Sequence, residues 1–238
     1  MNVSSEKNKR TIDNTRPLIH SLYENPIKPE EIEAKSFAAI DSEVETHDFT
    51  PEQWVVVRRM LHTTANFALV DKIRFSDDAI DSAISALEKG CAIFTDSNMI
   101  RTGISAARLR AVHAGYSKDD VFCNVADPDV AKESKSGGLP RSIYAVRKAK
   151  EMLNGGIAVF GNAPTALMEL SRMIVEDGVK PAAVIAMPVG FVHVVESKEE
   201  LMSLGVPYVA ITGRLGGSPL AVSVIHSLCA IAVERKLK

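Results

Sequence analysis

The chain has 238 residues, of which 46% are hydrophobic and 24% are charged, and its formal net charge is −2. A chain of this length can bury a sizeable core as one α/β domain. The small net charge gives no general attraction for polyanions, which argues against nucleic acid and anionic membranes as partners.

The first part of the chain is polar and is interrupted by Pro17 and Pro26, so we expect an N-terminal arm over residues 1–28 and a single domain over 29–238. The opening "MNVSSEKNKR" lacks the apolar core of a signal peptide, and no apolar run reaches the roughly 18 residues of a membrane span. The three cysteines form no CxxC pair, which favours a reducing, cytoplasmic location.

Two helices are predicted at the start of the domain. In "PEEIEAKSFAAIDSEV" the apolar residues are spaced for one broad helical face. The second helix has the clearest beginning in the chain, because Thr50 is a good N-cap, Pro51 fits the first helical position and Gln53 completes a capping box.

From residue 71 onward, short apolar runs alternate with longer helical patterns. The runs predict strands within residues 72–75, 91–96, 120–127, 157–163, 182–188 and 208–213. The patterns between them predict helices over residues 77–89, 141–153, 164–178 and 219–236, and one that begins at Ser197 with Glu200 as its capping-box partner. Apolar strands separated by helices indicate an α/β fold with a mainly parallel sheet covered on both faces.

Ligands of such sheets bind beyond the carboxyl ends of the strands, which here carry "TDSNMIRTG", "FGNAP", "MPVGF" and "TGRLGGSP". Backbone amides in these glycine-containing loops, followed by proline-initiated helices, suggest an amide-rich anion pocket. Arg101, Arg141 and Arg214 lie in or beside the loops and would suit a ligand with several carboxylates. The alternative is that the glycines serve only tight turns and the arginines are solvated. None of the loops matches a Walker A, GxGxxG or GxSxG motif.

The stretch "RRMLHTTANF" places His62 at the margin of the apolar face of its helix, one turn after Arg58 and Arg59. In the functional interpretation, the arginines hold carboxylates of the ligand and the ligand's charge controls the protonation of His62, which then acts as a general acid. The alternative is a boundary histidine that bonds a backbone carbonyl.

The remaining histidines are weaker candidates. His226 lies in an apolar helix and is expected to be a satisfied core residue, whereas His193 follows a strand end and is the main competitor of His62. No HxxxH or HExxH spacing occurs, so we expect no histidine-rich metal site.

Taken together, "RRMLHTTANF", "DSNMIRTGI", "GNAPTALMEL", "MPVGFVHVVESKEEL" and "GRLGGSPLAV", in this order, resemble the precorrin-8X methylmutase family, which includes the cobalt-precorrin-8 methylmutases of cobalamin biosynthesis. The resemblance covers roughly residues 30 to 235. It implies a flavodoxin-like three-layer α/β/α fold and a homodimer with pockets near the interface. It also implies an isomerase that moves a methyl group from carbon 11 to carbon 12 of the macrocycle, with no separate cofactor and with any cobalt carried by the substrate.

By the same resemblance, His62 matches the catalytic histidine, Arg59 and Ser36 match residues associated with substrate, and Arg141 and Ser142 match an Arg-Ser pair. The full set expected to bind substrate is Ser36, Arg59, Thr102, Arg141, Ser142, Asn162 and Arg214. Two other functions stay open: a non-enzymatic tetrapyrrole or corrinoid carrier with the same pocket, and a nucleotide- or flavin-binding protein of similar fold.

Overall fold

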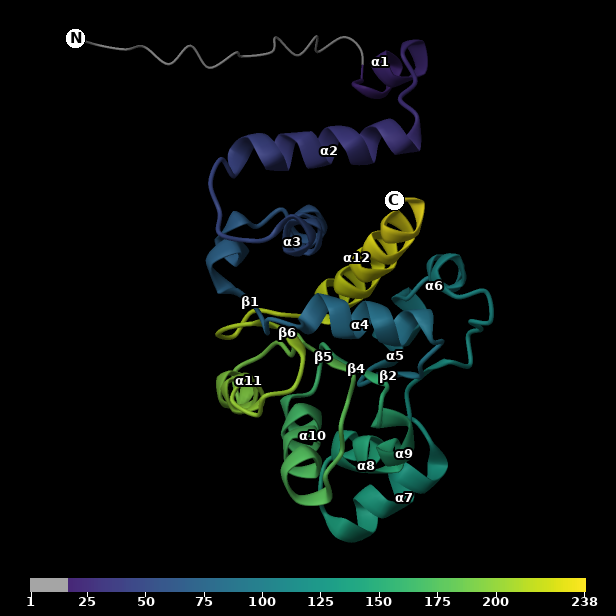
Figure 1. Ribbon diagram of the computed structural model, residues 1–238, viewed down its shortest axis with the longest axis vertical. Coiled ribbons are helices and arrows are strands. Elements are labelled where there is room, and N and C mark those ends of the chain that lie inside the picture. Colours follow the sequence, from purple (N-terminus) through teal and green to yellow (C-terminus); the bar gives the residue numbers. More distant parts are fainter. Residues whose placement is uncertain (1–16) are drawn as a thin grey trace, which may run out of the picture. The chain divides into compact units, whose positions relative to one another are not determined.

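The structure is a computed structural model that describes residues 17–238 (Figure 1). The chain divides between Glu43 and Val44 into two compact units. The first unit contains helices α1 (Ile19–Glu24) and α2 (Pro29–Glu43). Helix α1 therefore lies in the segment for which we expected an arm, whose first 16 residues fall outside the described part, and the predicted boundary at residues 28 and 29 lies inside this unit.

The second unit is built on a six-stranded sheet in the order β1-β6-β5-β4-β2-β3. Its strands are β1 (Ile73–Phe75), β2 (Ile93–Thr95), β3 (Val121–Phe122), β4 (Ile157–Phe160), β5 (Ala183–Ala186) and β6 (Tyr208–Ile211). All neighbours pair in parallel except β1, which runs antiparallel to β6 at one edge. The parallel strands, counted in chain order, follow the flavodoxin order 2-1-3-4-5, so the predicted flavodoxin-like, mainly parallel sheet is confirmed.

The central strands are apolar along their whole length because both of their faces are covered. Every residue of β4 and β5 is buried, in the register Ile157 to Ala183. Because both faces of these strands are buried, their sequences do not alternate between polar and apolar residues as those of a half-exposed strand do.

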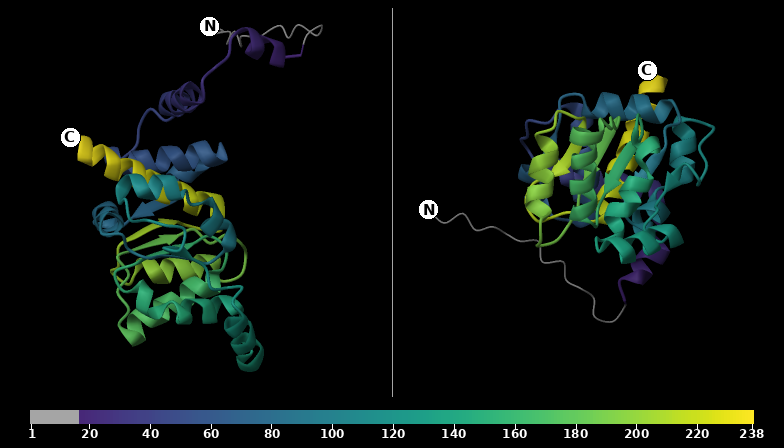
Figure 2. Two further views of the ribbon diagram at one scale, coloured as in Figure 1. Left: turned by 90° about the vertical axis from the view of Figure 1, so that its right-hand side faces the viewer. Right: turned by 90° about the horizontal axis from the view of Figure 1, so that it is seen from below.

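Helices cover the two faces of the sheet, as the views in Figures 1 and 2 show. One layer contains α3 (Pro51–Thr64), α4 (Ala79–Glu88), α5 (Asn98–Gly103), α6 (Ala106–Val112) and α12 (Ser218–Leu237). The other contains α7 (Pro128–Gly137), α8 (Arg141–Lys148), α9 (Lys150–Leu153), α10 (Pro164–Asp177) and α11 (Val194–Met202). A 3-10 turn, η1 (Phe67–Lys72), connects α3 to β1.

Helix α12 is the centre of its layer. It packs against α3, α4, α5 and α6 as well as against β4 and β5. A helix packed on several sides has no continuous polar face, which explains why most residues of α12 before Glu234 are apolar or small. On the other side of the sheet, Phe94 of β2 and Phe160 of β4 pack with ring centroids 5.9 Å apart at the core beneath α8–α11.

The capping box that predicted the start of α3 is present, with Thr50 and Gln53 bonded reciprocally. Two other helix boundaries differ from expectation. The helix predicted over residues 141–153 is interrupted at Ala149. Helix α11 begins at Val194 instead of Ser197, directly after His193, which adopts a left-handed conformation (φ 57°). Among residues 17–238, no helix is long and apolar enough to cross a membrane.

Candidate functional site

Helices α3, α5 and α12 enclose a pocket of about 350 Å³ in the second unit. It is lined by Arg59, His62, Thr63, Met99, Gly103, Ser218, Pro219, Val222, Ser223 and His226. The structure therefore brings two of the predicted site residues, His62 and Arg59, to one cavity. Most of the exposed wall is apolar, so the pocket combines a hydrophobic surface with a cation and two imidazoles.

The geometry of α3 explains why His62 and Arg59 face the same way. Residues three apart lie on one face of a helix, and Met60 and Leu61 between them are buried in the core. His62 is exposed and Arg59 is half-buried. The hydroxyl of Thr63 donates to the carbonyl of Arg59 at 2.8 Å, which ties this wall residue back to its own helix.

The pocket adjoins the carboxyl ends of the parallel strands, as predicted for a ligand site in this fold. The hydroxyls of Ser97, which follows β2, and Ser218, which begins α12, are 3.1 Å apart. At the end of β4, Gly161 packs so closely on this junction that an added Cβ would lie 2.9 Å from the Cα of Ser218. Glycine is required there because the backbones of β4 and α12 meet.

At "FGNAP", one of the loops expected to contribute amides to an anion pocket, a side chain of the protein already binds the amides. Asp96 is 3% exposed and its carboxylate accepts from the amides of Gly161 (3.1 Å), Asn162 (2.8 Å) and Ala163 (2.6 Å). Burial raises the pKa of Asp96 above its usual value, and the three amide donors act in the opposite direction. The side chain of Asn162 is carried on this fixed loop, and the residue is exposed.

A buried lysine holds the "GRLGG" loop. Lys198 of α11 is completely buried, and its ammonium donates to the carbonyls of Gly213 (3.0 Å) and Leu215 (2.7 Å). Desolvation lowers the pKa of Lys198 to about 8. Between these two anchors Arg214 is exposed, with its guanidinium carbon 5.6 Å from the ring centroid of Phe191. This role of Lys198 was not predicted from the sequence, because "ESKEEL" indicates only the start of a helix.

Arg141 and Ser142, two further residues predicted to bind substrate, do not line the His62 pocket. Arg141 is the exposed first residue of α8, and the hydroxyl of buried Ser142 is 2.8 Å from that of Thr165 at the start of α10. Ser36 belongs to α2 of the first unit, where its hydroxyl donates to the carbonyl of Ile32 at 2.8 Å. Their roles toward substrate stay predictions.

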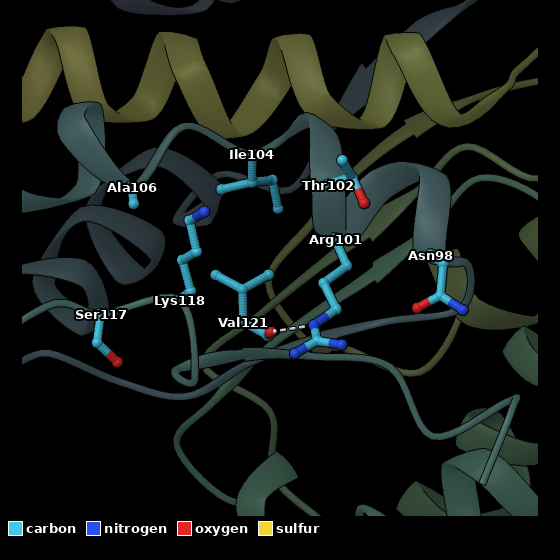
Figure 3. A pocket seen from close by; sticks show the side chains of 8 residues that line it. All are labelled: Asn98, Arg101, Thr102, Ile104, Ala106, Ser117, Lys118 and Val121. Atoms are coloured by element: carbon cyan, nitrogen blue, oxygen red, sulfur yellow. Dashed lines mark hydrogen bonds between the residues drawn. The ribbon is translucent and has the colours of Figure 1, made fainter.

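Thr102 lines a second pocket, of about 290 Å³, on the other side of α5 (Figure 3). Arg101 and Lys118 also line it, and the Nε of Arg101 donates to the carbonyl of Val121 at 3.0 Å. Helix α5 thus forms a wall between the two cavities, with Met99 and Gly103 toward the His62 pocket. Arg101, Arg141 and Arg214 are not among the residues that line the His62 pocket.

The sequence did not identify His226 as a site residue. It is half-buried on α12 and lines the same pocket as His62, and its Nε2 accepts from the amide of Ser105 at 3.0 Å. Burial, helped by the charges of Arg108 and Arg59, lowers the pKa of His226 to about 4. The expectation that it is hydrogen-bonded is confirmed, but it stands at a cavity wall and not within the core.

The three cysteines, Cys91, Cys123 and Cys229, are free thiols. Burial raises the pKa of Cys229 to about 12, so this thiol packs as a small hydrophobic group. Among the side chains that the structure describes, no three of histidine, cysteine, aspartate or glutamate are grouped so that they could hold a metal ion.

Comparison with known proteins agrees with this geometry. A family model described as precorrin-8X methylmutase matches residues 31–231. The chain belongs to the precorrin-8X methylmutase family. A cobalt-precorrin-8 methylmutase of Leptospira interrogans is 40% identical over 212 residues, which cover 86% of this chain and 94% of that protein. One of Priestia megaterium is also 40% identical, over 87% of this chain and 89% of that protein.

A solved structure, a precorrin-8x methyl mutase from Thermus thermophilus, superimposes with a TM-score of 0.78 at 38% identity. The alignment covers 87% of this chain and 97% of that one. Sequence and fold therefore agree over nearly the whole length of the relatives. This methylmutase is an isomerase of cobalamin biosynthesis.

Proposed function

We propose that the enzyme moves a methyl group from carbon 11 to carbon 12 of precorrin-8 or cobalt-precorrin-8, and that His62 is the proton donor. The products are hydrogenobyrinic or cobyrinic acid. The observation that carries the proposal is the placement of an exposed imidazole and a guanidinium on one face of α3, at a mostly apolar pocket.

In this mechanism Arg59 attracts a carboxylate of the substrate and the apolar wall, formed by residues such as Met99 and Val222, receives the ring face. His62 then protonates or hydrogen-bonds the ring near the migrating methyl, which lowers the barrier to the formal [1,5]-sigmatropic shift. Because the reaction is an isomerisation, the proton returns to His62 in the same turnover. A positioned acid of this kind accelerates a reaction by about 10²–10⁴-fold.

A pocket of about 350 Å³ is smaller than the tetrapyrrole, so it receives one edge of the macrocycle. We assign the other carboxylates to the polar residues expected from the sequence, Ser36, Thr102, Arg141, Ser142, Asn162 and Arg214. In this proposal the enzyme is a homodimer that needs no separate cofactor, and cobalt arrives within the substrate. The free thiols support the expected cytoplasmic location.

The test is His62→Ala in the full-length enzyme. We expect turnover to fall by about 10²–10⁴-fold while the variant still binds hydrogenobyrinic acid, because the variant removes the acid and leaves Arg59 and the apolar wall. His113→Ala is the matched control, since His113 bonds the carbonyl of Glu88 and does not line the pocket. Isomerisation at the wild-type rate in His62→Ala would remove His62 from the mechanism.

A product assay separates the enzyme from a carrier. Wild-type protein is incubated with metal-free and with cobalt-containing precursor, and the absorption spectrum is followed. Conversion of either form supports the isomerase and identifies the substrate, whereas binding without spectral conversion of both forms indicates a carrier.

A further inference from the structure

The methylmutase pocket contains a second histidine for which the proposed mechanism has no role. His226 lines the cavity from α12, whereas His62 and Arg59 line it from α3. The helices that carry the two histidines pack directly on one another. Apolar core residues such as Ile225 and Leu228 lie next to His226 on α12, and a half-buried imidazole among them needs a hydrogen-bond partner.

The hydrogen bond of His226 fixes which of its nitrogens carries hydrogen. Its Nε2 faces the backbone amide of Ser105, 3.0 Å away, and a backbone amide can only donate. Nε2 must therefore be the acceptor, and a neutral ring then carries its hydrogen on Nδ1.

The charges around His226 keep the ring neutral. Arg59 on α3 and Arg108 on α6 both disfavour a second positive charge there, and burial acts in the same direction. Protonation would also place a hydrogen on Nε2 against the Ser105 amide. His226 is therefore a poor acceptor for a proton released by His62.

The hydrogen on Nδ1 of His226 is available to donate to a ligand. No hydrogen bond joins Nδ1 to a described residue. Nδ1 is also not among the fully buried side-chain atoms that lack a partner, which means that it is accessible from outside the protein. The hydroxyls in the same wall are engaged elsewhere: Thr63 bonds the Arg59 carbonyl and Ser223 bonds the Leu220 carbonyl. Nδ1–H is therefore a donor at the cavity surface.

We propose that His226 is a substrate-binding residue, whose Nδ1–H donates to an oxygen of the same carboxylate that Arg59 attracts. This inference rests on the proposed function, because the ligand is a peripheral carboxylate of the tetrapyrrole. The neutral donor orients the carboxylate without adding charge beside His62. Tied to Ser105, the ring is held in one orientation before the ligand arrives, which reduces the entropy lost on binding.

Two substitutions separate the roles of the two ring nitrogens. In His226→Gln the amide oxygen stands near the position of Nε2 and still accepts from Ser105, but the donor at Nδ1 is lost. In His226→Asn the amide nitrogen stands near the position of Nδ1 and still donates, but the bond to Ser105 is lost. His113→Gln is the matched control, because this half-buried histidine also bonds the backbone and lies outside the pocket.

Affinity is measured by titrating full-length wild type and variants with hydrogenobyrinic acid. We expect His226→Gln to melt with the wild type and to bind about tenfold more weakly, the effect of one lost hydrogen bond to a charged acceptor. We expect His226→Asn to melt at a lower temperature and to bind more tightly than His226→Gln. Wild-type affinity in His226→Gln would overturn the proposal, as would weaker binding in His226→Asn than in His226→Gln.

The tautomer is tested without any ligand by ¹⁵N NMR of histidine-labelled enzyme at neutral pH. The His226 signals, assigned by their loss in His226→Gln, should show hydrogen on Nδ1 and none on Nε2; the opposite tautomer or a charged ring overturns the proposal. A wild type that binds no corrin would overturn the proposed function as well, whereas an unchanged affinity in His226→Gln overturns this inference alone.

Discussion

Replacement of Asp96 by asparagine should destabilise the enzyme at the strand ends next to its pocket. The wild-type carboxylate accepts from three amides, through Oδ1 from Gly161 and through Oδ2 from Asn162 and Ala163. Asparagine has nearly the same shape but only one oxygen. When this oxygen takes the place of Oδ2, the side-chain NH₂ group faces the amide of Gly161, and two donors meet in a buried site.

The magnitude follows from these three bonds. A lost hydrogen bond to a charged acceptor costs about 1.5–3 kcal/mol, and each of the other two bonds loses about 1 kcal/mol when its acceptor becomes neutral. Removing a buried charge offsets part of this, since burial raises the pKa of Asp96 and so opposes its ionisation. The net destabilisation of Asp96→Asn is about 2–3 kcal/mol, or about 5–10 °C in Tm for a unit of this size.

The assay is urea unfolding followed by circular dichroism, together with a thermal scan. Asp120→Asn is the control, because Asp120 also accepts from a backbone amide, that of Ser117, but in a half-buried loop where water can replace the bond. We expect this control to lose less than about 1 kcal/mol. The reasoning about the three amides is refuted when Asp96→Asn unfolds at the wild-type urea midpoint with an unchanged slope.

Two further predictions concern buried titratable groups. Lys198→Met should leave the carbonyls of Gly213 and Leu215 without their donor and should therefore lower Tm. It should also weaken binding of hydrogenobyrinic acid, because in our proposal Arg214 on that loop meets a carboxylate. An unchanged Tm would contradict the anchoring role of Lys198. Acidification should destabilise the enzyme through His226, because the unfolded state takes up a proton near pH 6.5 and the folded state only near 4, so stability is lost as pH falls through that window. The full pKa shift of His226 corresponds to a change of about 3 kcal/mol in the free energy of unfolding, and solvent screening reduces this change to about 1–2 kcal/mol. Urea titrations from pH 7 to 4 should show the loss in wild type and not in His226→Gln.

The sequence predicted those parts of the fold whose signals are local. The capping box at Thr50 located the start of α3, and continuous apolar runs located β4 and β5. Helices α5 and α6 were not predicted, since six or seven residues give too little periodicity to recognise. Local rules also misplaced the start of α11, because they cannot anticipate a left-handed histidine before Val194.

The site was predictable where neighbours in sequence are neighbours in space. Arg59 and His62 lie one helical turn apart, so their shared pocket follows from the helix alone. Asp96 and the amides it binds are 65–67 positions apart, and neither segment contains a sequence pattern that predicts their contact. The glycine-containing loop therefore looked like a ligand site although the fold satisfies it internally.

The two histidines of the pocket show why residue type alone could not assign their roles. Both occur in helices with apolar neighbours, yet His62 is exposed near the end of α3. His226 is half-buried at the cavity wall, and the amide of Ser105, 121 positions away in sequence, decides which nitrogen can donate. In the proposed mechanism the surroundings fix one imidazole as a neutral donor for a substrate carboxylate and leave the other accessible as the acid. That division of roles follows from the packing of α12 against α3 and α6, which only the folded chain reveals.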